Sequence, residues 1–103
     1  MARKGYFPVE ELNTFRIINS RLQGHPTAHE GLEVVRVASG SLGQVMSVAI
    51  GATLSKKLNM DSCLVYSLHS DGELQEGQNR EAIIYASANK VDNYIATVDL
   101  NGQ

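Results

Sequence analysis

Apolar residues recur at helical spacing near the start of the chain and predict a helix over residues 9–22. Pro8 suits the first turn of this helix because its fixed φ is already helical, and the carboxylates of Glu10 and Glu11 complement the positive end of the helix dipole. Glycine, proline and polar residues dominate residues 23–40 and predict a long connection. Structureless connections of this length are uncommon in compact domains and are often functional.

A further stripe of apolar residues predicts a helix over residues 41–58, with Ser41 as its N-cap. The same segment carries small residues at every fourth position, and these form one helix face: Gly43, Ser47, Gly51 and Ser55. A neighbouring helix or sheet can approach such a face closely. Two interpretations stay open, namely close packing inside one domain and a contact between subunits.

The rest of the chain has the pattern strand, helix, strand. A short apolar run over residues 62–69, ended by Asp71-Gly72, predicts a buried strand. Residues 93–99, rich in β-branched and aromatic side chains, predict another, and a helix from residue 74 or 75 to 89 lies between them. Strands joined in this way run parallel with a right-handed crossover. The predicted fold class is α/β, with helices around a small parallel sheet.

Two parallel strands are too few for an independent sheet. Parallel sheets are normally covered on both faces and contain several strands, whereas this sequence supplies one convincing βαβ unit. A length of 103 residues allows one small domain at most, so we expect residues 1–103 to form a single, partial domain. The sheet should be part of a larger one or be completed by another copy, which predicts self-association into a homo-oligomer.

Composition and charge exclude several classes of function. Nine Lys and Arg against eleven Asp and Glu give a formal net charge of −2, so no basic face is available for nucleic acid. The longest nearly uncharged stretch, residues 37–55, contains too many serines and glycines for a bilayer span, and no membrane association is expected. The single cysteine, Cys63, and the absence of an apolar segment after the N-terminal cations fit a protein of the reducing cytoplasm.

The sharpest candidate chemistry follows the two predicted strands. Asp71 comes after the first and Asn101 after the second, and the carboxyl ends of adjacent parallel strands meet at the edge where open α/β sheets bind ligands. Carboxylate, amide and carbonyl oxygens suit Mg²⁺, which usually keeps waters and substrate phosphates as its other ligands. Gly72 would let phosphate oxygens approach the backbone. The pattern predicts a Mg²⁺ diphosphate site; the alternative, that Asp-Gly and Asn-Gly are only turn dipeptides, stays open.

Other polar residues are weaker candidates. His25, in a Gly-His-Pro loop, either presents an imidazole to a polar substrate or is simply solvated. His69 has no partner visible in the sequence. Glu73 and Glu76 are candidate acid or base groups, but carboxylates in the first turn of a helix also have a structural role through the helix dipole.

Four blocks of sequence, in this order, resemble the thiamine-diphosphate-binding half of transketolases, particularly the N-terminal subunit of the split form. The blocks are Leu22-Gln23-Gly24-His25-Pro26-Thr27, Ser39-Gly40-Ser41-Leu42-Gly43-Gln44, Asp71-Gly72-Glu73-Leu74-Gln75-Glu76-Gly77-Gln78 and Ile95-Ala96-Thr97-Val98-Asp99-Leu100-Asn101-Gly102. The last two are similar to the Gly-Asp-Gly to Asn signature of thiamine diphosphate enzymes at large, and the first two to transketolase within that group. The resemblance covers residues 21–103 and implies a partial Rossmann-like, thiamine-diphosphate-binding fold.

The resemblance implies a site for Mg²⁺ and diphosphate at the strand ends. Asp71, Asn101 and the main-chain carbonyl of Gln103 would hold Mg²⁺. Gly72 and Asn101 would contact the diphosphate.

Further implied roles concern the rest of the cofactor, the substrate and an interface. The turn formed by Gly40, Ser41 and Leu42 would contact the middle and the pyrimidine end of thiamine diphosphate. His25 would face the sugar substrate, and Glu76 would lie in a carboxylate network at a dimer interface. The family reaction, part of the pentose phosphate pathway, moves a two-carbon ketol unit from a ketose phosphate to an aldose phosphate, and the cofactor does the carbon chemistry.

The chain departs from the family pattern at two positions near the implied cofactor. Ser70 stands where the family has the first glycine of Gly-Asp-Gly, a change that costs about 1–2 kcal/mol if the backbone there is left-handed. Val45 stands where the family has the last glycine of Gly-Gln-Gly, and its branched side chain is large enough to fill space that the pyrimidine ring needs.

Two hypotheses follow. The family's cofactor-contacting histidine and cofactor-activating glutamate belong to segments without a counterpart in these residues, so no catalytic residue is assigned and the isolated chain is expected to be inactive. In the first hypothesis the chain is a transketolase-type fragment that acts on sugar phosphates when other chains, such as a complementary transketolase subunit, supply those segments. In the second it is a non-catalytic α/β module that acts by self-association or partner binding.

Overall fold

The computed structural model describes residues 1–33 and 35–102. The chain divides into two compact units, Met1–Gly40 and Ser41–Gln103, which are described in turn. In the described part of the chain, no helix is both long and apolar enough to cross a membrane.

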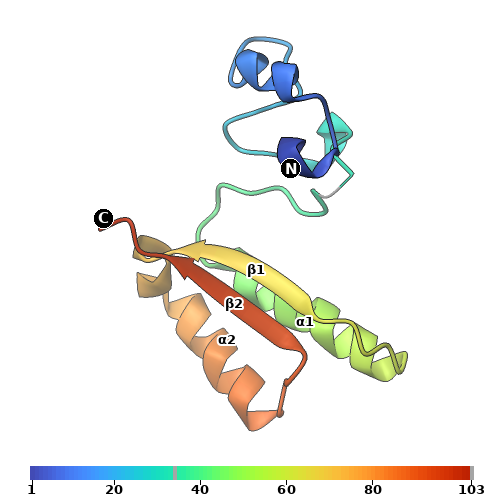
Figure 1. The fold of residues 1–103 in the computed structure, drawn as a ribbon. Coiled ribbons are helices and arrows are strands. Elements are labelled where there is room, and N and C mark those ends of the chain that lie inside the picture. The colour runs from blue at the N-terminus through green and yellow to red at the C-terminus, as the bar shows by residue number, and fades with distance from the viewer. Residues whose placement is uncertain (34, 103) are drawn as a thin grey trace. The chain divides into compact units, whose positions relative to one another are not determined.

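The first unit is built from short 3-10 helices and the turns between them (Figure 1). The helices span Ala2–Lys4 (η1), Val9–Thr14 (η2) and Ala28–Glu30 (η3). Its core is a cluster of four buried residues with one partly buried residue packed against them: Ala2, Phe7, Leu22 and Leu32, with Val35.

The predicted helix over residues 9–22 is wrong beyond Thr14. Arg16 and Asn19 adopt φ values of 63° and 66°, which a right-handed helix excludes. The Thr14 hydroxyl donates a hydrogen bond to the Glu11 carbonyl, and local bonds of this kind compete with helix formation. Ile18 is 89% exposed. Because part of the apolar stripe faces solvent, the stripe lacks the tertiary packing that supplies most of the stability of helices in proteins.

The second unit contains the predicted βαβ unit, preceded by a helix (Figure 1). Its elements are α1 (Gln44–Leu58), β1 (Val65–Ser70), the 3-10 helix η4 (Gly72–Gln75), α2 (Gly77–Ala88) and β2 (Tyr94–Asp99). The strands pair in parallel, in register from Val65 opposite Tyr94 to Ser70 opposite Asp99. The α/β fold class, with helices around a small parallel sheet, is confirmed.

One face of the two-stranded sheet is covered and the other is open. A core around Ile50 of α1 and Ala82 of α2 also contacts Tyr94 of β2. On the opposite face, Tyr66 and Leu68 of β1 are 65% and 70% exposed. The expectation that both strands are buried is therefore wrong within the second unit, because its two helices cover one side only. Completion by a larger sheet or by another copy stays a prediction.

Helix α1 begins later than predicted. Its first residue is Gln44, and Gly43, with a φ of 83°, occupies the N-cap position that was expected for Ser41. Gly43 has no side chain with which to cap the helix. The Glu73 carboxylate instead accepts a hydrogen bond from the Gly43 backbone N–H, across 30 positions of sequence, so the start of the helix is set by a tertiary contact.

Part of the small-residue face of α1 packs against the start of α2. A Cβ on Gly43 would lie 3.1 Å from the Cβ of Glu76, and the Ser47 hydroxyl accepts a hydrogen bond from the Gln78 amide at 3.2 Å. A Cβ on Gly51 would meet no atom of the described residues within 4 Å beyond the backbone of its own helix. Close packing within the unit thus accounts for the first half of this face, and the face is open at Gly51.

Candidate functional site

The two strand ends meet as predicted, and Asp71 is the residue that joins them. Its carboxylate accepts a hydrogen bond from the Gly72 N–H at Oδ1, over 3.0 Å, and one from the Gly102 N–H at Oδ2, over 3.2 Å. Asp71 therefore reaches the segment after β2 that contains Asn101. Gln103, the remaining residue expected to bind Mg²⁺, lies outside the described residues.

The donor chemistry at this edge fits a magnesium-bound diphosphate. The described residues contain no group of three or more His, Cys, Asp or Glu side chains that could hold a metal, so a metal here would rest on Asp71, the Asn101 amide and main-chain oxygens. Mg²⁺ accepts such a set, because it commonly takes one or two carboxylates and fills its other positions with waters and phosphate oxygens. Gly72 and Gly102 leave the backbone on either side of the carboxylate free of side chains.

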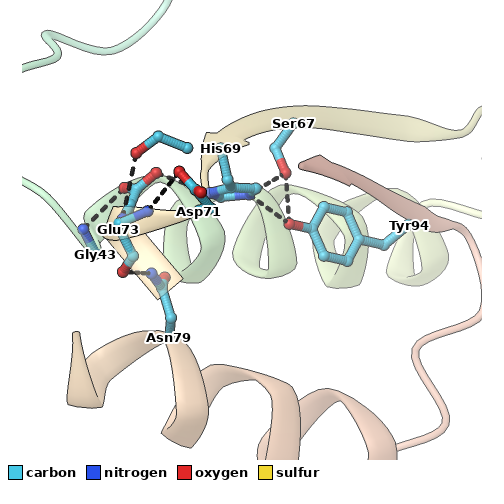
Figure 2. A network of polar contacts seen from close by, with 9 residues as sticks. Gly43, Ser67, His69, Asp71, Glu73, Asn79 and Tyr94 are labelled. Carbon is cyan, nitrogen blue, oxygen red and sulfur yellow. Dashed lines mark hydrogen bonds and ion pairs between the residues drawn. The ribbon is translucent and has the colours of Figure 1, made fainter. Parts of the chain in front are cut away.

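A buried polar network lies beneath this edge, on the sheet face that the helices cover (Figure 2). His69 is 2% exposed, and its Nδ1 lies 3.1 Å from Oε2 of Glu73. Its Nε2 lies 2.6 Å from the Ser67 hydroxyl and 3.3 Å from the Tyr94 hydroxyl. Burial raises the pKa of the Tyr94 phenol further above neutral pH, so its hydroxyl is protonated in this network.

Glu73 connects this network to three other segments of the second unit. Its Oε1 accepts a hydrogen bond from the Gly43 N–H at 2.8 Å, its backbone N–H donates to the Ser70 hydroxyl at 3.2 Å, and its carbonyl accepts from the Asn79 amide at 2.7 Å. The side chain is buried together with His69. The sequence indicates only an acid, a base or a dipole-stabilising group at Glu73, so this role is missed when the sequence is read alone.

One signal in the sequence could have revealed part of the network. Ser67 and His69 are two positions apart on β1, so their side chains lie on the same face of the sheet. Tyr94, which is opposite Val65 in the observed register, also lies on this face. A polar pair on a strand face that a helix covers requires partners. The hydrogen bond from the Gly43 N–H to the Glu73 carboxylate has no comparable signal in the local sequence.

The departure at Ser70 causes no backbone strain. Ser70 is the last residue of β1 and is not among the residues with positive φ in the described part of the chain. The left-handed penalty considered for this position therefore does not arise. Its hydroxyl has a use of its own, because it accepts the hydrogen bond from the Glu73 N–H at the start of η4.

In the first unit, the structure brings His25 and Gly40 together. Gly40 has a φ of 123°, and a Cβ there would lie 2.8 Å from Cδ2 of the His25 ring, so the contact requires glycine at this position. His25 also lines a polar pocket of about 420 Å³ that includes Arg16 and Glu30. The imidazole therefore borders an open, hydrophilic space.

The remaining candidates lie at the surface of the second unit. Ser41 and Leu42 are exposed, just before α1. Glu76 is exposed at the N-cap of α2, where no side-chain hydrogen bond caps the helix, and its expected role at a dimer interface stays a prediction. Val45 lies half-buried in the first turn of α1.

Known proteins match this chain over nearly its whole length. Residues 3–103 match the family described as transketolase, thiamine diphosphate binding domain. The chain is 44% identical over 101 residues to the transketolase of Pongo abelii, a match that covers 97% of this chain and 16% of that protein. It is 38% identical over 101 residues to one of the subunits of the apulose-4-phosphate transketolase of Actinobacillus succinogenes, covering 98% of this chain and 36% of that protein.

The match covers nearly the whole of this chain but a minor part of each relative. The human transketolase gives the same picture, with 42% identity over 97% of this chain and 16% of the human protein. The resemblance inferred from the four sequence blocks is thus confirmed by the match over residues 3–103. The chain belongs to the family of transketolase N-terminal, thiamine-diphosphate-binding domains.

Proposed function

We propose that this chain binds the diphosphate of thiamine diphosphate through Mg²⁺ and, together with segments supplied by other chains, takes part in two-carbon ketol transfer between sugar phosphates. The observation that carries the proposal is the junction at the end of the parallel sheet. There the Asp71 carboxylate, which follows β1, contacts the backbone of Gly102, which follows β2. This is the edge at which open α/β sheets bind their ligands.

Each residue at the junction has a defined task in this proposal. Asp71, the Asn101 amide and the Gln103 carbonyl hold Mg²⁺, and Gly72 and Asn101 contact the diphosphate. Asp71 is suited to this task because its two backbone hydrogen bonds fix the carboxylate at the end of β1 before any ligand arrives. When bound, thiamine diphosphate supplies the carbon–carbon bond chemistry, and the protein binds and orients it.

The other assigned residues act around the cofactor. We propose that Gly40, Ser41 and Leu42 contact its middle and its pyrimidine end, and that His25 contacts the sugar phosphate. The polar pocket beside His25 supports this last assignment, because a hydroxylated substrate requires hydrogen-bonding walls.

The partner in this proposal is a complementary transketolase subunit. Two relatives are themselves named as transketolase subunits, one of an apulose-4-phosphate transketolase and the other of a 6-deoxy-6-sulfo-D-fructose transketolase from a Clostridium species. On this likeness, we expect ketol transfer only when the chain is mixed with a second polypeptide that supplies the remaining cofactor site. The carboxylate of Glu76 is our candidate for the contact with it.

A second candidate function is that of a non-catalytic module that self-associates. The open sheet face with Tyr66 and Leu68 favours it, because exposed apolar residues on a sheet are commonly covered by another chain. Analytical ultracentrifugation tests this candidate. A monomer throughout the micromolar range contradicts it, and a stable dimer without cofactor affinity would make it the better account.

A pair of aspartate variants tests the first proposal. Asp71→Ala removes the proposed Mg²⁺ ligand. The control Asp92→Ala removes the same charge just before the first residue of β2, at the other end of the strand from the proposed site, where the side chain is 78% exposed. We expect Asp71→Ala to abolish magnesium-dependent binding of thiamine diphosphate in a calorimetric titration, and Asp92→Ala to retain it. Equal binding by both variants would contradict the proposed site.

A further inference from the structure

We propose that Glu73 is a positioning residue, which fixes the start of α1 relative to the metal-binding loop at Asp71. The inference rests on the proposed function, in which residues at both places contact the same cofactor. Its distinctive element is the Glu73 side chain, which points into the protein while the neighbouring Asp71 lies at the sheet edge (Figure 2).

The two carboxylate oxygens of Glu73 hold different segments. Oε1 accepts the Gly43 N–H at 2.8 Å, and Oε2 lies 3.1 Å from Nδ1 of His69. Gly43 is the residue on which the chain turns into α1, with a φ of 83°, and it directly follows the proposed cofactor contacts Ser41 and Leu42. One side chain therefore links the turn before α1 to the end of β1.

The backbone of Glu73 is held as firmly as its side chain. The Ser70 hydroxyl accepts its N–H, and the fully buried Asn79 donates to its carbonyl. These bonds hold the Glu73 backbone to the end of β1 and to the first turn of α2, so that a displacement of the Gly43 turn has to break its buried hydrogen bond to the Glu73 carboxylate. Breaking such a bond to a charged group is costly, because the group is left without compensation.

His69 completes the arrangement by orienting the carboxylate. Its Nε2 is engaged by the hydroxyls of Ser67 and Tyr94, which leaves Nδ1 to face Glu73 (Figure 2). Since both oxygens of Glu73 are used inside the fold, this carboxylate does not face solvent or a ligand. Its role is therefore indirect: it preorganises the turn that precedes α1.

The test compares Glu73→Ala, Glu73→Gln and the control Glu10→Ala, which removes an exposed carboxylate of the first unit. Glu73→Ala removes the acceptor of the Gly43 N–H. Glu73→Gln keeps an acceptor oxygen, and its amide can donate to His69. Two readouts are needed: hydrogen exchange of the Gly43 amide without ligand, and the Kd for thiamine diphosphate with Mg²⁺.

We expect Glu73→Ala to speed Gly43 exchange and to raise the Kd, each by roughly ten- to a hundredfold, the effect of losing a hydrogen bond to a charged group. In Glu73→Gln, the Gly43 exchange rate and the Kd should stay close to those of the unchanged chain, and Glu10→Ala should change neither quantity. If Glu73→Ala does not fold, hydrogen exchange of the unchanged chain still tests the bond between Glu73 and Gly43. The Gly43 amide must then exchange more slowly than the amides of Ser41 and Leu42.

The outcomes separate this inference from the proposed function. If the unchanged chain binds the cofactor and Asp71→Ala does not, but Glu73→Ala binds as well as the unchanged chain, the positioning role is refuted and the function stands. If the unchanged chain does not bind the cofactor, the proposed function fails and the positioning role fails with it. An unprotected Gly43 amide in the folded chain refutes the bond on which the inference is built.

Discussion

Adding a methyl group at either of two glycines of the α1 segment should have opposite effects on stability. Gly43 precedes the helix with a φ of 83°, a region in which a residue with a Cβ is strained by about 1–2 kcal/mol. The added Cβ would also lie 3.1 Å from the Cβ of Glu76, which the backbone at the start of α2 holds in place, so this contact adds to the strain. We therefore expect Gly43→Ala to lower the free energy of unfolding by about 1–2 kcal/mol.

Gly51, which lies inside α1, is the matched control for Gly43. It is exposed between the two ends of α1, and an added Cβ would meet no described atom within 4 Å apart from the backbone of the helix itself. Replacing an exposed helical glycine by alanine reduces the entropy of the unfolded chain and stabilises a helix by roughly 0.5–1 kcal/mol. The two variants should thus differ by about 1.5–3 kcal/mol, or about ten- to 150-fold in the unfolding equilibrium constant.

Urea denaturation followed by circular dichroism measures this difference directly, and thermal unfolding should show a gap of roughly 6–24 °C between the two variants. A Gly43→Ala variant as stable as the unchanged chain would refute the left-handed turn before α1. A destabilising Gly51→Ala would show that the open part of the helix face is covered in solution, which would favour the subunit contact that the sequence left open.

Three further predictions concern the second unit. Lys56 donates a hydrogen bond to Asp61 at 2.6 Å and holds the pKa of that carboxyl well below its ordinary value, so the stability that this pair contributes is present above about pH 4 and is lost as the pH falls. Asp61→Asn should therefore flatten the dependence of urea midpoints on pH between about 2 and 5. Hydrogen bonding to Asp61 and the charge of its carboxylate raise the pKa of the exposed Cys63 thiol, so Asp61→Asn should speed alkylation of Cys63 at pH 8, and an unchanged rate would contradict this. Ile50→Ala, in the core at 4% exposure, should cost about 2–4 kcal/mol of unfolding free energy, whereas Ile84→Ala, at 68% exposure, should stay within about 0.5 kcal/mol; similar losses would argue against the core.

The sequence predicts the second unit better than the first because the two are stabilised differently. The strands and α2 follow from local apolar runs with turn residues between them, and the parallel pairing follows from the length of the crossover. The first unit carries a helical stripe as well, but Ile18 remains 89% exposed and the chain turns at Arg16 instead. Periodicity indicates which face a helix would bury, and it does not indicate whether anything lies there to cover that face.

The same distinction applies to the candidate site. The approach of Asp71 to the segment after β2 is a consequence of topology, so it could be inferred before the structure was known. The contact of Glu73 with Gly43 joins residues 30 positions apart in sequence through one side-chain rotamer. Neither spacing nor composition carries that information. This contact also replaces the Ser41 cap that helix rules predict.

The most direct test of the proposed function is the magnesium dependence of thiamine diphosphate binding by the unchanged chain. We would titrate the cofactor by calorimetry into protein of known oligomeric state, first with Mg²⁺ and then with a chelator. The account predicts saturable binding with Mg²⁺ that disappears with the chelator, because Asp71 acts on the diphosphate through the metal. Absence of binding at millimolar cofactor, or binding of equal strength with the chelator, would contradict it.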